Sequence, residues 1–143
     1  MLYLAYGSNM IVADMDWRCP NAIMLDTFEL NDWRLVFHNF ADVVPDPQSS
    51  VPAVLWQITE SCLASLDHYE GYPHLYNRVM IATPQGDAWM YVMQNNPALA
   101  LPHARYYAGM MGAYLDLRLR RTPLRLAWEE AYAEEKKQER LAL

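Results

Sequence analysis

The stretch that decides the fold reads MLYLAYGSN, residues 1–9 of the chain. Its first six residues are apolar and alternate moderately, which is typical of a strand, and Gly7-Ser8-Asn9 signals a turn after that strand. We expect a short helix over residues 10–17, with Ser8 or Asn9 as its N-cap. The fold therefore begins with a strand, a glycine turn and a helix.

Strand patterns recur through the middle of the chain. They cover residues 23–30, 33–40, 51–58, 76–83 and 88–94. Before the third of these, VPDPQSS (residues 44–50) carries two prolines, and we expect an exposed loop there. The turn Pro84-Gln85-Gly86 separates the last two and predicts a hairpin.

Helical patterns occur in the middle and at the end of the chain. Thr59 is the expected N-cap of a helix that runs through Asp67 and is broken by Gly71. Further along, apolar residues fall at helical spacing, and Thr122 followed by Pro123 marks the start of a last helix, with Thr122 as its N-cap. The fold class is therefore α+β, with about five or six strands and a closed or nearly closed sheet.

The composition is that of one globular domain. Of the 143 residues, 53% are hydrophobic and 20% are charged. We therefore expect a single domain over residues 1–143, with residues 120–143 as a C-terminal helix packed on it. The formal net charge of −6 argues against a nucleic-acid partner. Without an apolar run of about 18 residues or a signal-peptide pattern, no membrane partner and a cytoplasmic location are expected.

The cysteines and histidines show no pattern of a metal or redox centre. Cys19 and Cys62 could pair, but no framework spacing or secretory segment supports a disulfide, so we expect two buried or inert thiols. The four histidines match no metal-ligand array, and no dinucleotide, phosphate-loop or nucleophile-elbow motif is present. No metal and no cofactor are therefore expected.

Two segments hold candidate functional residues. In YGSN (residues 6–9), a glycine turn at the start of a helix lets backbone N–H groups face a carboxylate or a developing oxyanion. An ordinary capped turn would have the same sequence. In LDHYEGYPHLYNR (residues 66–78), Glu70 lies among tyrosines where a helix gives way to a turn. Partial burial, together with the charge of Asp67, would raise the pKa of Glu70 toward that of a general base; alternatively, both carboxylates are solvated.

Together these segments resemble the γ-glutamylcyclotransferase-like family, also called AIG2-like. The specific feature is YGSN followed, about sixty residues later, by an LDxxEG motif and a tyrosine. The resemblance runs in order through YGSNM (6–10), RCPNA (18–22), WRLVF (33–37), AVLWQIT (53–59), LDHYEGYPHLY (66–76), YVM (91–93) and a helix over 106–116.

The resemblance implies a small mixed β-barrel of about five to seven strands with a few packed helices. It also implies a cavity into which Glu70 projects. In active family members the glutamate of LDxxEG is the essential acid/base, which assigns that role to Glu70. The family's opening loop binds the γ-glutamyl group, so the expected substrate-binding residues include Tyr6, Gly7, Ser8 and Asn9.

Two further tyrosines, Tyr76 and Tyr106, match tyrosines that line the family's site. The family's usual glycine after the late helix is Ala113 here, one residue past Gly112. The register of that helix therefore decides between Tyr106 and Tyr107.

The function that the resemblance implies is conversion of a γ-glutamyl amide or γ-glutamyl amino acid to 5-oxoproline and a free amine or amino acid. The α-amine of the substrate attacks its own γ-carbonyl, which fits a chain without a nucleophile motif. Backbone N–H groups, with Arg18 or Arg78, would receive this anionic or zwitterionic substrate. The expected partner is that small molecule, with the chain a monomer or a homodimer.

Two other interpretations stay open. The same fold could serve as a non-catalytic module that binds a small polar ligand, although a pure binding site gains nothing from a buried, unpaired carboxylate. The last helix could also dock a partner protein through its apolar face, or simply cover its own domain.

Overall fold

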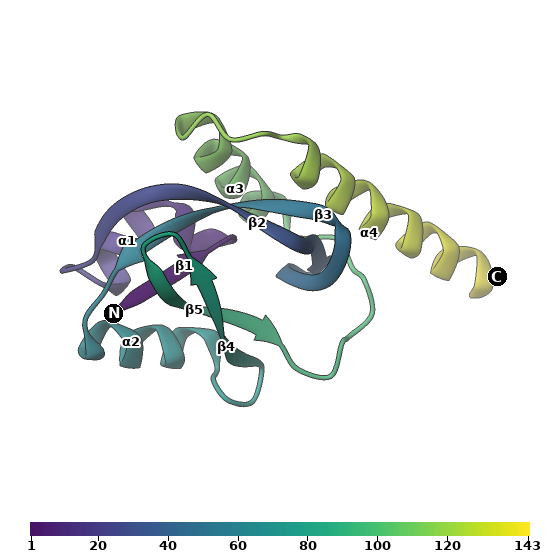
Figure 1. Cartoon of the computed structure of the whole chain (residues 1–143). Coiled ribbons are helices and arrows are strands. Elements are labelled where there is room, and N and C mark those ends of the chain that lie inside the picture. The colour runs from purple at the N-terminus through teal and green to yellow at the C-terminus, as the bar shows by residue number, and fades with distance from the viewer.

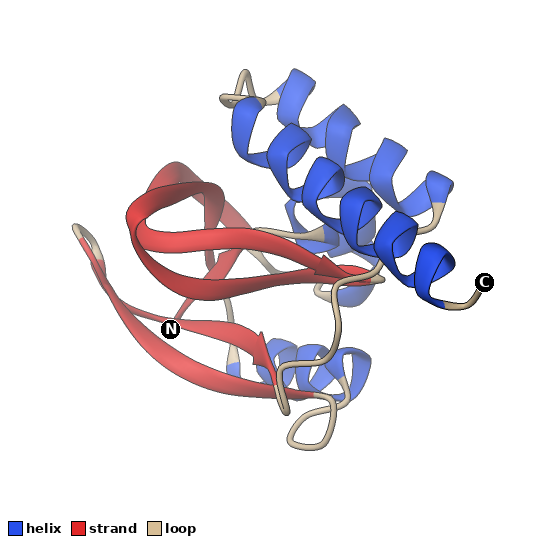
Figure 2. Ribbon diagram, turned by 90° about the vertical axis from the view of Figure 1, so that its right-hand side faces the viewer, coloured by secondary structure: helices blue, strands red, loops and turns tan.

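A five-stranded mixed sheet carries the fold, and four α-helices lie around it (Figures 1 and 2). The computed structural model describes residues 1–143. In chain order the elements are β1 (Leu2–Ala5), the 3-10 helix η1 (Ser8–Met10), α1 (Val12–Arg18), β2 (Ile23–His38), β3 (Phe40–Gln57), α2 (Glu60–Glu70), β4 (Tyr76–Thr83), β5 (Gly86–Met93), α3 (Ala104–Asp116) and α4 (Thr122–Leu141). None of these helices is long and apolar enough to cross a membrane.

The sheet has the order β2-β3-β1-β5-β4. The short central strand β1 pairs antiparallel with β3 and parallel with β5, and the two hairpins β2–β3 and β4–β5 extend to either side. The predicted α+β class is confirmed, but the sheet is not closed. The edge strand β2 packs against α4 instead of pairing with the other edge strand, β4 (Figure 2).

The hairpin β2–β3 corrects one prediction. Residues 44–50, expected as an exposed loop, belong to the continuous strand β3. The register jumps from the pair Asn31–Ser50 to the pair Trp33–Pro45, so residues 46–49 have no partner in β2. An irregularity of this kind accommodates prolines, which cannot donate to a ladder.

The predicted helix caps are right at one helix and wrong at two. Thr59 accepts a hydrogen bond from the Cys62 N–H at the start of α2, and Gly71 follows the helix in a left-handed conformation, with a φ of 67°. Neither Ser8 nor Asn9 caps α1, because η1 precedes that helix and the Asn9 side chain has other partners. Thr122 is the first residue of α4 and makes no cap hydrogen bond.

One apolar core joins the sheet to all four helices. The last helix, α4, buries Leu124, Ala127 and Ala131 in this core. This part of its apolar face therefore covers the chain's own sheet.

A disulfide between Cys19 and Cys62 ties the end of α1 to the first turn of α2. The expectation of two unpaired thiols is wrong. The two cysteines are 43 residues apart and meet only because α1 and α2 pack together, so sequence spacing alone gave no sign of the pair.

Candidate active site

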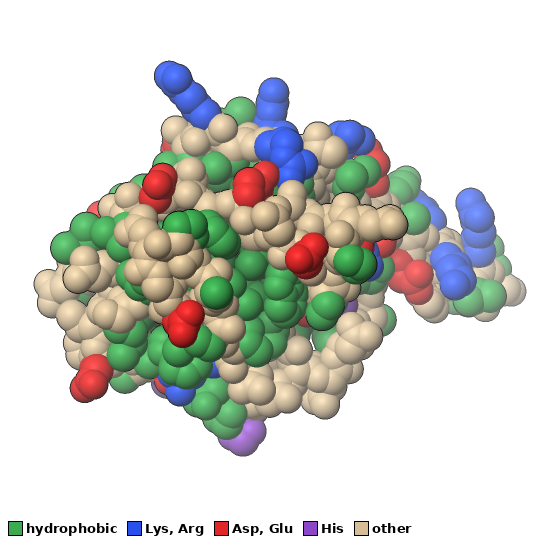
Figure 3. Space-filling view, viewed as in Figure 1, with side chains coloured by type: hydrophobic (Ala, Val, Ile, Leu, Met, Phe, Trp, Pro, Cys, Tyr) green, Lys and Arg blue, Asp and Glu red, His purple; other side chains and the backbone are tan.

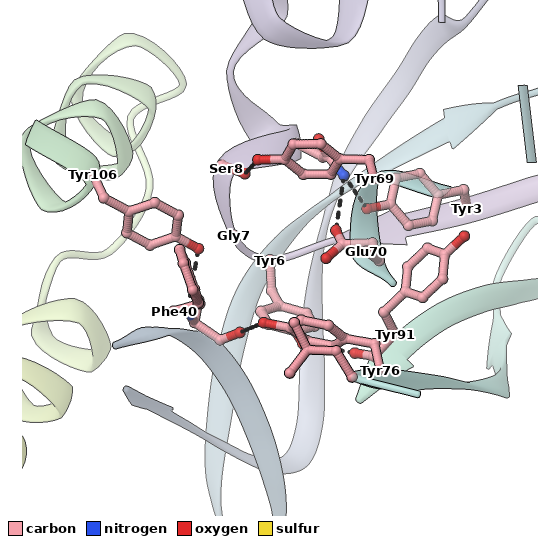
Figure 4. A pocket seen from close by; sticks show the side chains of 13 residues that line it. Tyr3, Tyr6, Gly7, Ser8, Phe40, Tyr69, Glu70, Tyr76, Tyr91 and Tyr106 are labelled. Carbon is pink, nitrogen blue, oxygen red and sulfur yellow. Dashed lines mark hydrogen bonds between the residues drawn. The ribbon is translucent and has the colours of Figure 1, made fainter. Parts of the chain in front are cut away.

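A pocket of about 280 Å³ opens where η1, the end of α2 and the start of α3 approach one another. Six of its thirteen lining residues are tyrosines, which we call the tyrosine wall (Figure 4). The structure brings together in this pocket seven of the residues singled out from the sequence, namely Tyr6, Gly7, Ser8, Asn9, Glu70, Tyr76 and Tyr106. The other lining residues are Tyr3, Phe40, Ala41, Tyr69, Leu75 and Tyr91.

Glu70 is the only charged residue in the lining. It is the last residue of α2, and its carboxylate points toward the tyrosine wall (Figure 4). Burial raises the pKa of Glu70 to about 7, and the positive charge of Arg18 opposes that rise. Asp67 does not contribute as expected, because its carboxylate accepts a hydrogen bond from the Tyr91 hydroxyl (2.7 Å) and pairs with Arg78 (3.4 Å).

Asn9 links the first turn to Glu70. Its Nδ2 donates to Glu70 Oε1 at 3.2 Å and to the Tyr3 hydroxyl at 2.8 Å (Figure 4). Its Oδ1 accepts from Arg18, whose guanidinium also lies 3.6 Å above the centre of the Tyr69 ring. Because arginine can only donate, it turns the amide oxygen of Asn9 toward itself and the NH2 group toward Glu70.

The turn Gly7-Ser8-Asn9 needs its glycine for space. A Cβ on Gly7 would lie 3.3 Å from both the Ala41 Cβ and the Tyr106 hydroxyl. The N–H groups of the three residues donate to no backbone carbonyl. The first turn thus combines close packing with N–H groups that pair with no backbone carbonyl, of which the Ser8 N–H bonds to the Tyr106 hydroxyl.

The hydroxyls of the tyrosine wall are oriented by the backbone. Tyr6 donates to the Tyr91 carbonyl at 2.6 Å and Tyr76 to the Ala41 carbonyl at 2.7 Å, while Tyr106 accepts from the Ala41 N–H at 3.1 Å. Burial raises the pKa of Tyr106 to about 12 and moves the pKa values of Tyr6 and Tyr76 upward as well. These hydroxyls therefore stay neutral at physiological pH.

A buried histidine–carboxylate pair lies behind this wall. His38 Nε2 is 3.3 Å from Asp42 Oδ2, and both side chains are almost fully buried. Asp42 also accepts from the Met93 N–H at 2.9 Å, and His38 Nδ1 lies 3.1 Å from the Ala98 carbonyl. Because Asp42 follows Ala41, this pair fixes the backbone that orients Tyr76 and Tyr106.

The helix α3 decides between its two adjacent tyrosines. Tyr106 lines the pocket, whereas Tyr107 packs edge-to-face on Phe37 and against Trp128. Neither arginine proposed to receive an anionic substrate lines the pocket. Arg18 is engaged by Asn9 and Tyr69, and Arg78 stacks on Tyr72 and Trp89.

Several lining residues had no assigned role in the sequence. Tyr3 lies on β1 and Tyr91 on β5, and their rings meet edge-to-face at 5.8 Å because β1 and β5 pair. The strand patterns of residues 1–6 and 88–94 predicted that both tyrosines lie in strands. They did not indicate which face of the sheet each side chain occupies. Phe40 gave no signal, and Leu75 fell within the family-like segment 66–76 without an assigned role. No three His, Cys, Asp or Glu side chains cluster so as to hold a metal ion.

Comparison with known proteins identifies the family of the chain. A family model described as "Gamma-glutamyl cyclotransferase, AIG2-like" matches residues 3–109. The Gamma-glutamylcyclotransferase of Mus musculus is 33% identical over 82 residues, which cover 49% of this chain and 44% of that protein. The chain thus aligns with less than half of that relative's length. The "Gamma-glutamylcyclotransferase family protein ytfP" of Citrobacter rodentium is 30% identical over 66% of this chain and 82% of its own length.

Solved structures extend the likeness to nearly the whole chain. A structure titled "Gamma-glutamyl cyclotransferase" superposes with a TM-score of 0.72 at 26% identity, covering 94% of this chain and 87% of its own. The family match spans the sheet, α1 and α2, and reaches into α3. The chain belongs to the gamma-glutamyl cyclotransferase, AIG2-like family.

Proposed function

We propose that this chain is a γ-glutamylcyclotransferase-type enzyme that converts a γ-glutamyl amide or γ-glutamyl amino acid to 5-oxoproline and a free amine or amino acid. The observation that carries the proposal is Glu70, a partly buried carboxylate without a cationic hydrogen-bond partner, beside the turn Gly7-Ser8-Asn9. Membership of the family and the names of the relatives support the same activity.

The proposed reaction is an intramolecular aminolysis. The α-amine nitrogen of the substrate forms a bond to its own γ-carbonyl carbon, and the amide bond to the leaving amine breaks. One proton passes from the attacking nitrogen to the leaving nitrogen, so no water is consumed. Because the nucleophile is tethered for closure of a five-membered ring, the protein must position it rather than supply one.

Glu70 is assigned the transfer of that proton. A pKa of about 7 leaves a large fraction of the carboxylate ionised at neutral pH and keeps the conjugate acid strong enough to return the proton. Its side chain is held by the Asn9 amide. A fully exposed carboxylate would ionise near its ordinary pKa and would therefore be a weaker base.

The turn Gly7-Ser8-Asn9 is assigned the oxyanion and the polar head of the substrate. Its backbone N–H groups are free of carbonyl partners, and fixed N–H donors of this kind stabilise the charge that develops on a carbonyl oxygen. The neutral tyrosine hydroxyls around the pocket would orient the substrate in its folded conformation. The proposed mechanism requires no metal and no cofactor.

The test is Glu70→Gln, which keeps the shape of the side chain and removes its basicity. We expect E70Q to release 5-oxoproline from γ-glutamyl substrates about 10²- to 10⁴-fold more slowly than wild type, with an unchanged circular dichroism spectrum. Glu60→Gln, at the exposed opposite end of α2, is the matched control and should turn over at the wild-type rate.

Two results would contradict the proposal. Normal turnover by E70Q would mean that Glu70 is not the base. Binding of γ-glutamyl compounds by wild type without any release of 5-oxoproline would identify the chain as a non-catalytic binding module.

A further inference from the structure

His38 and Asp42 are two ionisable side chains that the proposed mechanism does not use. His38 is 6% exposed and Asp42 3%, and they approach each other across the turn between β2 and β3. His38 is the only ion-pair partner of Asp42, and neither side chain lines the pocket. Burial of ionisable groups costs free energy unless their charges and hydrogen bonds are matched, so the protonation state of this pair matters to the backbone around it.

The hydrogen bonds of His38 require one more proton than a neutral ring beside an ionised carboxylate would supply. Nδ1 lies 3.1 Å from the Ala98 carbonyl, which can only accept, so Nδ1 carries its hydrogen. In a neutral ring Nε2 would then be an acceptor, and so would the Asp42 Oδ2 that lies 3.3 Å away. No other group bonds to Nε2. A favourable contact therefore needs one further proton, carried by Nε2 or by Oδ2.

The surroundings of the pair favour that proton. Tyr6, after β1, and Tyr76, on β4, both lie near Asp42, and both hydroxyls stay neutral because burial raises their pKa values. On α4, Glu135 accepts from the Leu101 N–H at 2.7 Å, in the segment between β5 and α3. None of these groups is a cation that could balance Asp42, and burial raises the pKa of Asp42 itself. With its proton, the pair has no net charge.

The pair joins the turn between β2 and β3 to the segment between β5 and α3. Asp42 Oδ1 accepts from the N–H of Met93, the last residue of β5, at 2.9 Å. His38 reaches the Ala98 carbonyl further along the chain. That segment leads into α3, which carries Tyr106. The two side chains thus anchor the turn and the start of α3 to each other.

Ala41, which precedes Asp42 in β3, is where this anchoring reaches the pocket. Its carbonyl accepts from the Tyr76 hydroxyl at 2.7 Å, and its N–H donates to the Tyr106 hydroxyl at 3.1 Å. Its Cβ also limits the space around Gly7 in the first turn. A displacement of about 1 Å in groups that position a substrate can lower turnover about 10²-fold, so the placement of this backbone matters to the reaction.

We propose that His38 and Asp42 are positioning residues, which hold one proton between them and so fix the backbone of Ala41. That backbone orients the hydroxyls of Tyr76 and Tyr106 for turnover. This inference rests on the proposed function. Loss of the proton, or of either partner, leaves a buried polar group without a hydrogen bond and releases the backbone that the pair holds.

Two substitutions of Asp42 separate its hydrogen bonds from its proton. In Asp42→Asn the amide oxygen can accept from the Met93 N–H, and the NH2 group can donate to Nε2 of a neutral His38. In Asp42→Ala both bonds are lost. We expect D42A to lower kcat about 10²-fold, with a smaller change in KM, and D42N to stay within about threefold of wild type because each polar group keeps a partner.

Release of 5-oxoproline measures both variants, and circular dichroism checks that they fold. Asp87→Ala is the matched control, because Asp87 is exposed near the start of β5 and lies outside the pocket. It should turn over at the wild-type rate.

NMR reads the proton directly and does not depend on activity. In wild type at pH 7 we expect Nδ1 of His38 to be protonated, together with either Nε2 in the ¹⁵N spectrum or the Asp42 carboxyl in the ¹³C spectrum. In D42N the ring should be neutral, with Nδ1 protonated and Nε2 bare. Among the four histidines only His38 should change, which assigns its signals.

Several outcomes would overturn the inference. A neutral His38 ring beside an ionised Asp42 in wild type would show that no proton is held. Wild-type turnover by D42A would show that the pair does not position the pocket, and a D42N enzyme more than about tenfold slower than wild type would show that matched hydrogen bonds are not enough. If D42A does not fold, the spectra and D42N still decide.

Failure of the proposed function would give a different result. Wild type would then release no 5-oxoproline from any γ-glutamyl compound, while the spectra would still report the proton. The Kd of γ-glutamyl-alanine would replace turnover as the measure of positioning. Equal Kd values for wild type and D42A, or no binding by wild type, would overturn the inference as well.

Discussion

The helix pair α1 and α2 and the helix pair α3 and α4 use charged side chains in opposite ways. At the α1–α2 pair, Glu70 is partly buried and receives its hydrogen bond from a neutral amide. At the α3–α4 pair, charges lie at the surface and are matched, as in Arg34–Glu130 and Arg125–Glu129. Figure 3 shows most Lys and Arg side chains along α3 and α4, while apolar atoms cover the face around β4 and β5.

This difference shows where the chain holds a charge that lowers the stability of the fold. Exposed ion pairs add little to stability and cost little. A carboxylate held away from water lowers the stability of the fold unless it is protonated, so its retention at the bottom of a ligand-sized pocket points to chemistry rather than to packing.

The largest expected effect is a loss of stability at high pH, caused by the ionised carboxylate of Glu70. If this loss were absent, the contrast between the two helix pairs would not hold. The pKa of Glu70 rises from its ordinary value of 4.5 to about 7 on folding. The folded state therefore binds the proton more tightly, and stability is lost as the pH rises from 4.5 through about 7. We expect the free energy of unfolding of E70Q to exceed that of wild type by up to about 3 kcal/mol at pH 8 and by almost nothing at pH 4.

Urea denaturation at both pH values measures this difference. Glu60→Gln serves as the control, because Glu60 is exposed on the same helix and its replacement should change stability equally little at both values. A gain for E70Q that did not depend on pH would show that the carboxylate is already well solvated in the folded protein.

The local elements of this region could be read from the sequence. The cap at Thr59, the left-handed Gly71 and the hairpin β4–β5 follow from signals within a few residues, and the structure has each of them. The same is true of Glu70, because a motif and its flanking tyrosines mark it. The roles assigned to Glu70 and to the first turn stay predictions.

The long-range features could not be read in the same way. Cys19 meets Cys62 only through helix packing, and the prolines of residues 44–50 hid a strand whose partner pairs around an irregularity. The pocket-lining residues Phe40 and Leu75 come from a tight hairpin turn and from the segment after Gly71. Their common position depends on the register of three strands, which no single segment specifies.

A prediction of intermediate size concerns Arg18, a cation near the pocket, and its effect on the pKa of Glu70. The charge of Arg18 lowers the pKa of Glu70, so Arg18→Met should raise that pKa and move the acidic limb of the kcat/KM profile upward by about one unit. Arg18→Lys, which keeps the charge, should leave the limb close to its wild-type position. A limb that stays in place in R18M, with only a loss of rate, would mean that Arg18 acts through the orientation of Asn9 alone.

The smallest expected effect lies at the other helix pair. Glu130 pairs with Arg34 between α4 and β2, and about 40% of each side chain is exposed. Arg34 keeps a second partner in Asp46 at 3.3 Å. Glu130→Gln should therefore lower the free energy of unfolding by only about 0.2–1 kcal/mol, and this loss should shrink in about 1 M salt because exposed charges are screened. Urea denaturation at low and high salt, with 5-oxoproline release as a second readout, checks both points. A loss of several kcal/mol, or a change in turnover, would mean that surface charges support the pocket across the sheet, and the contrast between the two helix pairs would no longer hold.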